Sequence, residues 1–478
     1  MRSTAAWTGG IVLSGLTTSC KTGLAGTPTA HRESRPNILF LAVDDLRTQL
    51  NCYGHKETLS PAIDQLASEG IVFGRAYCQV PVCGASRASL MTGIRPNYPA
   101  RFTEAGSRAD QDTPKAITLA EHFKNNGYHT ISNGKIFHYV ADSADSWSEK
   151  PWRVYDYDTD KQGDWGAYHF DKIWLNPASK QAVNPKTGRG PFWEMADVPD
   201  HAYDDGKTAE KTIEDLRRMK AGNQPFFIAC GFSKPHLPFN APKKYYDLYN
   251  PDEINLADNR FAIAGKPPEC TNSSEINSYS LVSGWPDKEA FHRQARHAYY
   301  ACVSYVDALI GKILAELKTL DLDRNTIIVL WGDHGWHLGE HNFWGKHNTL
   351  NNALQVPLIV RVPGSRQNLR TDALVEFVDI YPSLCEFAGL PYPDSHTLDG
   401  KSFVPLLNNP NQPWKEAVFS QWKKAKAVKT DRYLYTEWSS GSKMLFDHLS
   451  DPQENINIAD QPEAADTVAH LSSLLKTS

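Results

Sequence analysis

Several apolar segments of this chain end abruptly in charged or imidazole side chains, and this pattern constrains the fold more than any other feature. Residues 38–43 are apolar on both faces, which is typical of a central parallel strand covered by helices. Further segments end in the same way, and the polar residues that follow the whole set are Asp44 and Asp45, Lys135 and His138, His236, and Asp333 and His334. Ligands bind open α/β sheets at the carboxyl ends of the strands. The sequence therefore predicts a functional site at one sheet edge.

Helical segments alternate with these predicted strands. Ser60 and Pro61 supply an N-cap and a first helical residue, and Gly70 ends the helix that follows. Further helices are predicted over residues 118–126 and 297–320. Alternation of strands and helices predicts a mostly parallel α/β sheet flanked by helices.

The pattern changes near residue 405, where short β-type segments are followed by a predicted helix over 463–475. We expect a small antiparallel sheet with one helix, packed on the main domain. Two stretches rich in Pro, Asp, Asn and Gly are expected to be insertions over the sheet edge, where specificity is often built; they span 150–225 and 250–290. The predicted domains are an export signal and tether over 1–34, a catalytic domain over 35–405 and a C-terminal α+β subdomain over 406–478.

Composition narrows the class of protein. A hydrophobic content of 41% fits a soluble globular protein, and a net charge of −5 argues against nucleic-acid binding, which needs a broad basic surface. The first residues resemble a bacterial export signal, and Cys20 follows a loose lipoprotein cleavage pattern. We expect a periplasmic or cell-surface protein that reaches the membrane, if at all, only through a lipid anchor at Cys20. The other cysteines, Cys83 aside, allow several pairings, and no bridge is predicted.

The residues at the strand ends indicate a metal and an anion. Asp44, Asp45 and Asp333 offer hard oxygen ligands for a divalent cation, and without one they would repel each other. The imidazole of His334 suits zinc or manganese better than calcium.

Basic side chains accompany these carboxylates. Arg87, Lys135 and Lys346 together would form a pocket for a tetrahedral oxyanion, either sulfate or phosphate. Beside such a pocket, His138 and His236 would be natural proton-transfer groups.

Residues 83–93, CGASRASLMTG, resemble the type I sulfatase signature: a Cys, any residue, Pro or Ala, any residue, Arg, and a closing Thr-Gly. The segments NILFLAVDDL, NGKIFH, SKPHLPF and WGDHGWHLGEHNFWGK stand in that family's order over most of residues 36–405. NGKIFH and His334 resemble the iduronate-2-sulfatase branch. The resemblance implies an alkaline phosphatase-like sandwich with a large, mostly parallel sheet. It also implies that a formylglycine-generating enzyme oxidises Cys83 to Cα-formylglycine, and that one Ca²⁺ is held by Asp44, Asp45, Asp333, His334 and the modified Cys83.

The resemblance also implies a mechanism. Hydrated formylglycine carries two hydroxyls on one carbon; one attacks sulfur and displaces the sugar alcohol, and the other, once deprotonated, expels sulfate. His236 would protonate the leaving alcohol and His138 would take the second proton. The sulfate oxygens would be held by Arg87, Lys135 and Lys346, and the substrate would be faced by Trp336 and His337. The expected substrate is a sulfated oligosaccharide or polysaccharide, with a 2-O-sulfated uronate or related unit.

Two other functions compete with this one. A phosphatase or phosphodiesterase of the same superfamily would use Ser or Thr as nucleophile and usually two metals, and the intact segment around Cys83 argues against it. A non-catalytic protein that binds sulfated glycans would be expected to have lost Lys135, His138 or His236, and all are present. A run of lysines near the C-terminus could bind a glycan, but we expect it to form a solvated face of the protein. The run comprises Lys423, Lys424, Lys426 and Lys429.

Overall fold

The computed structural model describes residues 9, 35–154, 173–222 and 224–477. The expected export signal and tether, with Cys20, lie outside the described residues apart from Gly9. Residues 35–478 form one compact unit.

The main sheet has the strand order β10-β2-β11-β7-β1-β5-β3, with β12 paired to β2. The strands β3, β5, β1 and β7 are all parallel, whereas β11 runs antiparallel to both of its neighbours. The expected mostly parallel sheet is confirmed. Its strands are β1 (Asn37–Val43), β2 (Ile71–Tyr77), β3 (His129–Gly134), β5 (Phe226–Phe232), β7 (Thr326–Gly332), β10 (Gln355–Val356), β11 (Leu358–Arg361) and β12 (Leu369–Glu376).

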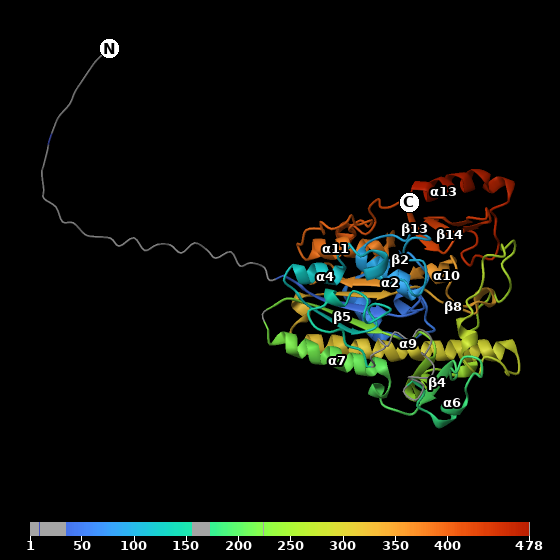
Figure 1. Ribbon diagram of the computed structural model, residues 1–478, viewed down its shortest axis with the longest axis horizontal. Helices are drawn as coiled ribbons and strands as arrows, with labels where there is room; N and C mark the ends of the chain where they lie inside the picture. The colour runs from blue at the N-terminus through green and yellow to red at the C-terminus, as the bar shows by residue number, and fades with distance from the viewer. Residues whose placement is uncertain (1–8, 10–34, 155–172, 223, 478) are drawn as a thin grey trace, which may run out of the picture. The chain divides into compact units, whose positions relative to one another are not determined.

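Helices cover both faces of this sheet, and strand β1 shows how. Its alternate residues Ile38, Phe40 and Ala42 join one buried core, while its other residues belong to a second core on the opposite face. The first core contains residues of α2 (Cys83–Thr92), α4 (Leu119–Asn125) and α11 (Ile380–Phe387). The second contains residues of α1 (Pro61–Glu69), α7 (Asp204–Lys220) and α9 (Lys288–Thr319). Figure 1 shows α7 and α9 below the sheet, with α2, α4 and α11 above it.

Two helices differ from the sequence prediction. Helix α9 begins earlier than residue 297, because Asp287 caps it by accepting a hydrogen bond from the backbone N–H of Ala290 at 2.8 Å. By length and apolar composition α9 could cross a membrane, but most of that stretch is buried inside the structure, like the core helix of a globular protein. Helix α7 lies within the predicted insertion 150–225, yet it is a core helix. The prediction missed it because its buried face carries Thr208 and Thr212 among few large apolar residues.

Outside α7, the described residues of the two predicted insertions form mostly short elements. Strand β4 (Trp193–Ala196) pairs in parallel with β6 (Phe239–Pro242), and a short 3₁₀ turn, η5 (Glu275–Ser278), follows an irregular stretch. Among the described residues, the other short α-helices and strands are α3 (Ala109–Asp112), α6 (Pro177–Gln181), α8 (Lys243–Tyr246), α10 (Asn351–Leu354), α12 (Val404–Asn408), β8 (His337–Leu338) and β9 (Trp344–Gly345).

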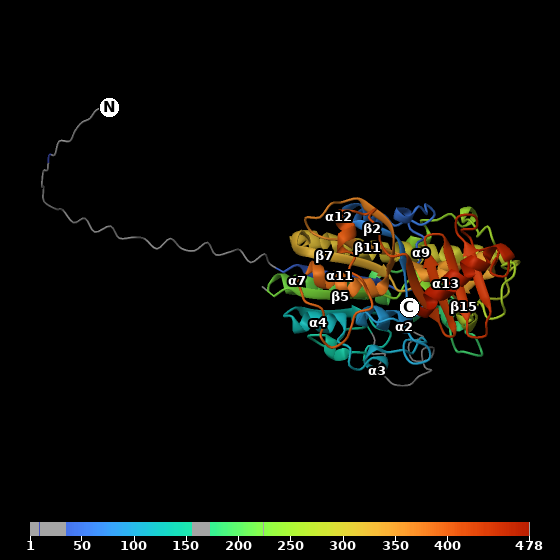
Figure 2. The same cartoon turned by 90° about the horizontal axis from the view of Figure 1, so that it is seen from above.

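The C-terminal region forms the expected antiparallel sheet with one helix. Its elements are β13 (Ala417–Trp422), β14 (Ala425–Thr430), β15 (Tyr433–Trp438), β16 (Lys443–Asp447) and α13 (Ala465–Thr477). The backbone N–H of Gln421 donates to the carbonyl of Gln79 at 2.7 Å, which joins this sheet to the segment after β2. Figure 2 shows the small sheet and α13 beside the main sheet. Lys429 is buried within β14, so it does not belong to the solvated face predicted for the lysine run.

Candidate active site

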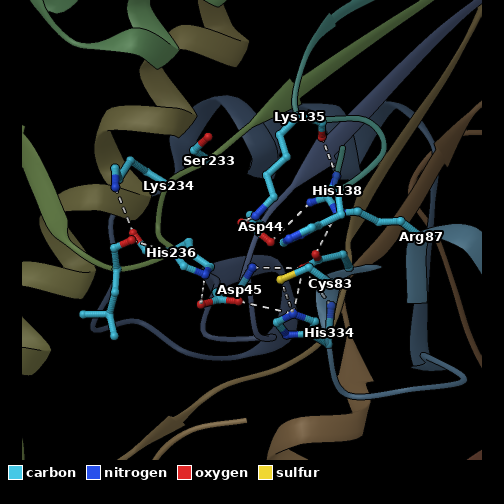
Figure 3. A network of polar contacts seen from close by, with 12 residues as sticks. Asp44, Asp45, Cys83, Arg87, Lys135, His138, Ser233, Lys234, His236 and His334 are labelled. Carbon is cyan, nitrogen blue, oxygen red and sulfur yellow. Dashed lines mark hydrogen bonds and ion pairs between the residues drawn. The ribbon is translucent and has the colours of Figure 1, made fainter. Parts of the chain in front are cut away.

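The predicted polar residues meet at the carboxyl ends of neighbouring parallel strands. In the register of the sheet, the last residue of β1 lies opposite the last residues of β5 and β7. Asp44 and Asp333 therefore leave the sheet side by side. Lys135 follows β3, and His236 lies four residues beyond the end of β5. Figure 3 shows the side chains of Asp44, Lys135 and His236 converging on the same space.

Cys83 is the first residue of α2, so it enters the site from the N-terminal end of a helix. The next residue, Gly84, leaves no room for a side chain, because an added Cβ would lie 2.0 Å from the carbonyl oxygen of Ala105. One turn later, Arg87 projects from the same face of the helix. Gly93, with φ +66°, ends α2 in the left-handed conformation. The signature residues thus form a short, completely buried helix whose first residue faces the strand ends.

An acidic cluster surrounds the sulfur of Cys83. Cys83 Sγ lies 3.3 Å from Nε2 of His334, and that nitrogen lies 3.3 Å from Oδ1 of Asp45. Asp333 Oδ1 accepts the backbone N–H groups of Asp45 and His334, both at 3.0 Å. One ligand atom from each of Asp44, Cys83, Asp333 and His334 lies within 4.8 Å of the others. This geometry brings together the residues predicted to hold a metal.

The donor set fits a divalent cation. Asp45 Oδ2 is buried and has no hydrogen-bond partner among the described residues. A buried carboxylate oxygen without a partner is unfavourable, and a cation beside it would satisfy it. Asp44 and Asp333 supply hard oxygen ligands beside His334 and Cys83, and Asp45 offers another beside Asp44 and Cys83.

Cations balance the carboxylates from the other side. Arg87 pairs with Asp333 (Nε to Oδ2, 2.9 Å) and with Asp44 (Nη2 to Oδ1, 3.3 Å), and Lys135 also pairs with Asp44. Lys346 Nζ lies 2.7 Å from Asp45 Oδ1. Arg87 is wholly buried and bonds to protein groups, including the carbonyl of Ile136 at 2.9 Å. In this geometry it holds the carboxylates and the strand-end backbone in place.

Burial and charge set the protonation of the central groups. Although burial opposes it, the Lys135 ammonium, aided by His236 and Arg87, holds the pKa of Asp44 well below its usual value. Burial raises the pKa of the Cys83 thiol, and the Asp44 carboxylate adds to this effect. Cys83 is therefore held as a neutral thiol, which is a poor nucleophile.

The two histidines have opposite electrostatic environments. Burial lowers the pKa of His138 well below its usual value, and the Lys135 ammonium lowers it further. Despite burial, Asp45 and Glu275 raise the pKa of His236 to about 10, against the opposing charge of Lys346. One imidazole is thus held neutral and the other charged, as a site with one base and one acid requires.

A cavity of about 280 Å³ opens beside these groups. Its wall includes Lys135, His138 and His236 from the predicted set. Three further cations line it as well: Arg153, Arg189 and Lys234. The cavity is large enough for a sugar-sized ligand to reach the strand ends.

Trp336 and His337, expected to face the substrate, are almost completely buried and do not line this cavity. The Trp336 ring packs edge-on against Phe239, and its face lies 5.2 Å from Lys346 Nζ. His337 Nε2 lies 3.2 Å from Asn348 Oδ1. This corrects the expectation. The loop after β7 turns these side chains inward, where the face of the Trp336 ring packs against the ammonium of Lys346.

Residues that the sequence reasoning missed also belong to the site. Glu275 contacts His236 and Lys346, and Arg189 and Lys234 line the cavity. Arg189 lies in an irregular stretch and Glu275 begins the short turn η5, both in regions that were predicted only as insertions, where no periodic pattern indicates which side chains point inward. The sequence does place Lys234 at the end of a predicted strand together with His236, but no role was predicted for it.

Comparisons with known proteins agree with this geometry. The family model described as "Sulfatase" matches residues 36–390, and the model for the C-terminal region of N-sulphoglucosamine sulphohydrolase matches residues 339–478. The chain is 35% identical to iduronate 2-sulfatase from Homo sapiens, over 75% of this chain and 70% of that protein. It is 32% identical to a sulfatase from Formosa agariphila, over 92% of this chain and 86% of that protein.

Solved structures share the fold at lower identity. BT4656, solved with its substrate D-glucosamine-2-N,6-O-disulfate, is 21% identical, with a TM-score of 0.73 and coverage of 93% of this chain and 97% of that one. A phosphonate monoester hydrolase from Agrobacterium radiobacter is 22% identical, with the same TM-score and coverage of 93% and 95%. The match over most of the chain, the identity to iduronate 2-sulfatase and the cluster around Cys83 confirm the resemblance read from residues 83–93: this chain is a member of the sulfatase family, a sulfuric ester hydrolase.

Proposed function

We propose that this chain hydrolyses sulfate esters of a sulfated carbohydrate, with Cys83 converted to Cα-formylglycine as the source of the nucleophile. The environment of Cys83 supports this role. A cysteine that attacks as a thiolate has a lowered pKa, whereas burial and Asp44 raise the pKa of the Cys83 thiol. The residue nevertheless lies at the centre of the charged cluster. Cys83 therefore fits a precursor that is modified before the protein acts, which requires a formylglycine-generating enzyme as a maturation partner.

The proposed metal is one Ca²⁺, held by Asp44, Asp45, Asp333, His334 and the modified Cys83. Such an ion, when bound, supplies a positive charge that stabilises negative charge on the sulfate oxygens and on the attacking oxygen. The Oδ2 atom of Asp45 supports this site, because it has no hydrogen-bond partner among the described residues and its nearest ion-pair partner, His236 Nε2, lies 4.0 Å away. Arg87 bonds to two of the proposed ligands, Asp44 and Asp333, and keeps them at the strand ends.

The remaining groups act directly on the substrate in this proposal. Lys135 and Lys346 bind the sulfate oxygens, because both ammonium groups lie beside the cluster and Lys346 Nζ is 3.5 Å from Cys83 Sγ. His236 protonates the oxygen of the leaving alcohol, and its raised pKa supports that role. His138 accepts a proton from the nucleophile residue, and its lowered pKa keeps it neutral for this purpose.

The proposed substrate unit is a 2-O-sulfated uronate or a related sugar with a second anionic group. Within the described part of the chain, Arg189 pairs with no carboxylate; its guanidinium donates to Ser278 Oγ at 2.7 Å and lies 5.1 Å from the centre of the Tyr279 ring. Among the described residues, Lys234 donates to the backbone carbonyls of His236 and Pro238 and to no carboxylate. Two cations that line the same cavity without a carboxylate partner favour a substrate with a carboxylate or a second sulfate. Action outside the cytoplasm, in the periplasm or at the cell surface, is part of the same proposal.

The observation that carries the proposal is the position of Cys83 among the carboxylates and cations at the strand ends. Its test is sulfate release from defined oligosaccharides that differ in sugar and in sulfate position, with the matching phosphate esters alongside. We expect release from a 2-O-sulfated uronate unit and much slower release of phosphate. Faster hydrolysis of the phosphate esters would instead favour the phosphatase function.

Arg189→Ala separates recognition from chemistry in the same assay. A charge-assisted hydrogen bond contributes about 1.5–3 kcal/mol, so KM for the uronate substrate should rise by about 10-fold or more. Hydrolysis of a small aryl sulfate should not change. Arg217→Ala is the matched control, because Arg217 lies exposed on α7 and pairs with Glu316. An equal loss on both substrates would show that Arg189 does not bind the second anionic group.

A further inference from the structure

Glu275 joins two of the proposed catalytic groups. Its Oε1 lies 3.1 Å from Nε2 of His236, and its Oε2 lies 3.4 Å from Nζ of Lys346. The Glu275 side chain is only 18% exposed and lines the cavity. The other ring nitrogen of His236, Nδ1, lies 2.6 Å from the carbonyl oxygen of Leu237. Oxygen atoms therefore face both ring nitrogens, and the imidazole has a defined orientation.

The segment that carries Glu275 is itself fixed. The backbone N–H of Glu275 donates to Ser273 Oγ at 3.3 Å, and its carbonyl accepts from Ser278 Oγ at 2.6 Å. Ser273 Oγ also lies 3.1 Å from Nδ1 of His347, the residue after Lys346. The carboxylate is thus held against His236 and Lys346 by the backbone on either side of it, not only by the two ion pairs.

Electrostatics explains why a carboxylate is useful at this position. His236 and Lys346 both carry positive charge in the proposed mechanism, and two cations that converge on one sulfate ester repel each other. A carboxylate between them offsets this repulsion and fixes the distance between the two groups.

We infer that Glu275 is a positioning residue: its carboxylate orients the imidazole of His236 so that the Nε2 proton, which faces Glu275 Oε1 in this structure, passes to the oxygen of the leaving alcohol while Lys346 binds the sulfate. The inference rests on the proposed function. Glu275 contributes no atom to the reaction; it acts through the imidazole.

This role predicts a dependence on the leaving group. A sugar alcohol is a poor leaving group and needs a proton from His236, whereas a nitrophenolate leaves without one. Glu275→Gln keeps the size of the side chain and removes its charge. It should lower kcat/KM for a sulfated sugar by about 10- to 100-fold, a part of the roughly 10²–10⁴ that a positioned acid contributes. For 4-nitrophenyl sulfate the loss should be much smaller.

The experiment measures kcat/KM of the mature, full-length protein and of Glu275→Gln on a series of substituted phenyl sulfates and on one sulfated sugar. The variant should show a steeper dependence on the pKa of the leaving alcohol than the unmodified sequence does. Glu269→Gln is the matched control, because Glu269 lies in the same stretch but is exposed and contacts only Ser440 and Ser442 of the C-terminal sheet. Equal loss on every substrate, or no loss, would overturn the inference while leaving the proposed function intact.

A second comparison excludes a purely structural effect. In a His236→Gln background, the further change Glu275→Gln should cost little, because the group through which Glu275 acts is already absent. Full additivity of the two losses would contradict the inference. If the unmodified sequence, once mature, releases no sulfate from any substrate, the proposed function fails and the inference fails with it. An unchanged unfolding temperature of each variant shows that the fold is intact.

Discussion

At the scale of single residues, the site depends on backbone geometry that no side-chain pattern encodes. Asp45 has φ +57°, in the left-handed region that few residues other than glycine adopt. Its backbone N–H donates to Asp333 and its carbonyl accepts from the Tyr299 hydroxyl at 2.8 Å. Such strain persists only where the surroundings fix it, and it is common at functional sites. It turns both neighbouring carboxylates, Asp44 and Asp45, toward the cluster.

Lys135 gives a prediction at this scale. Its ammonium lies beside Asp44 and lines the cavity, where charge on the sulfate oxygens grows as the ester bond breaks. Removing such a preorganised group typically costs about 10²–10³ in turnover. Lys135→Ala should therefore lower kcat strongly on a small aryl sulfate, and kcat/KM with it. The exposed Lys220→Ala serves as control.

The measurement is steady-state kinetics on the aryl sulfate and on a sulfated oligosaccharide. If Lys135→Ala changed only KM, and only on the oligosaccharide, Lys135 would belong to sugar recognition and not to the sulfate pocket.

The sequence predicted most of the cluster because strand ends are visible as breaks in apolar segments. Asp44, Asp333 and Lys135 each follow such a break directly, and parallel strands bring their ends together. The prediction that Trp336 faces the substrate was wrong, because the direction of a loop side chain depends on tertiary packing, here against Phe239. Glu275 was missed for the same reason, since it lies on a short 3₁₀ turn without a periodic apolar pattern.

At the scale of elements, one helix depends on another for its cap. The sequence predicted Ser60 as the N-cap of α1, but the Ser60 side chain makes no cap hydrogen bond. Asp307, on α9, accepts the backbone N–H groups of Ile63 at 2.8 Å and Ala62 at 3.2 Å instead. A cap supplied from a distant element cannot be read from local sequence, although the helix itself was predicted correctly.

Asp307 therefore links the stability of α1 to pH. Burial raises the pKa of its carboxyl to about 7, above the ordinary value of 3.8, and Asp64 adds to the effect. Between these two pH values the folded protein holds a proton that the unfolded chain has lost, so stability falls as pH rises through this window.

Asp307→Asn should remove this pH dependence, because an amide does not ionise. The difference in unfolding temperature between the unmodified sequence and Asp307→Asn should therefore shift in favour of the variant between pH 5 and pH 8. Asp307→Ala should destabilise at both pH values, by about 1–2 kcal/mol, since it leaves two N–H groups of α1 without acceptors. A constant difference across this pH range would contradict the raised pKa.

At the scale of the whole molecule, the fold class was predictable from the sequence, whereas the domain boundary near residue 405 stays a prediction. Alternating segments gave the parallel sheet, and short segments after residue 405 gave the antiparallel one. The small sheet nevertheless adds Val418, Ala427 and Leu434 to the core of the main domain. The family model for the C-terminal region also begins at residue 339, well before the predicted boundary. Contacts between the two sheets arise from tertiary packing, which composition does not reveal. A prediction from composition therefore assigns the two sheets to separate domains.

The net charge of the chain also differs in sign from the charge of the cations at its active site. The chain carries a net charge of −5 although the proposed substrate is an anion. Attraction must therefore come from the local group of Lys135, Arg189, Lys234 and Lys346.

The central claim is that the mature protein acts through an aldehyde-derived group at position 83, and mass spectrometry of the active protein tests it directly. Trypsin cleaves after Arg75 and Arg87 and releases residues 76–87, which contain both Cys78 and Cys83. Cys78 is a buried free thiol and serves as an internal control for alkylation. In protein made together with a formylglycine-generating enzyme, we expect Cys78 to be alkylated and position 83 to carry the lighter aldehyde, in a fraction that rises in proportion to kcat. Full turnover by protein in which both positions are alkylated thiols would contradict the account.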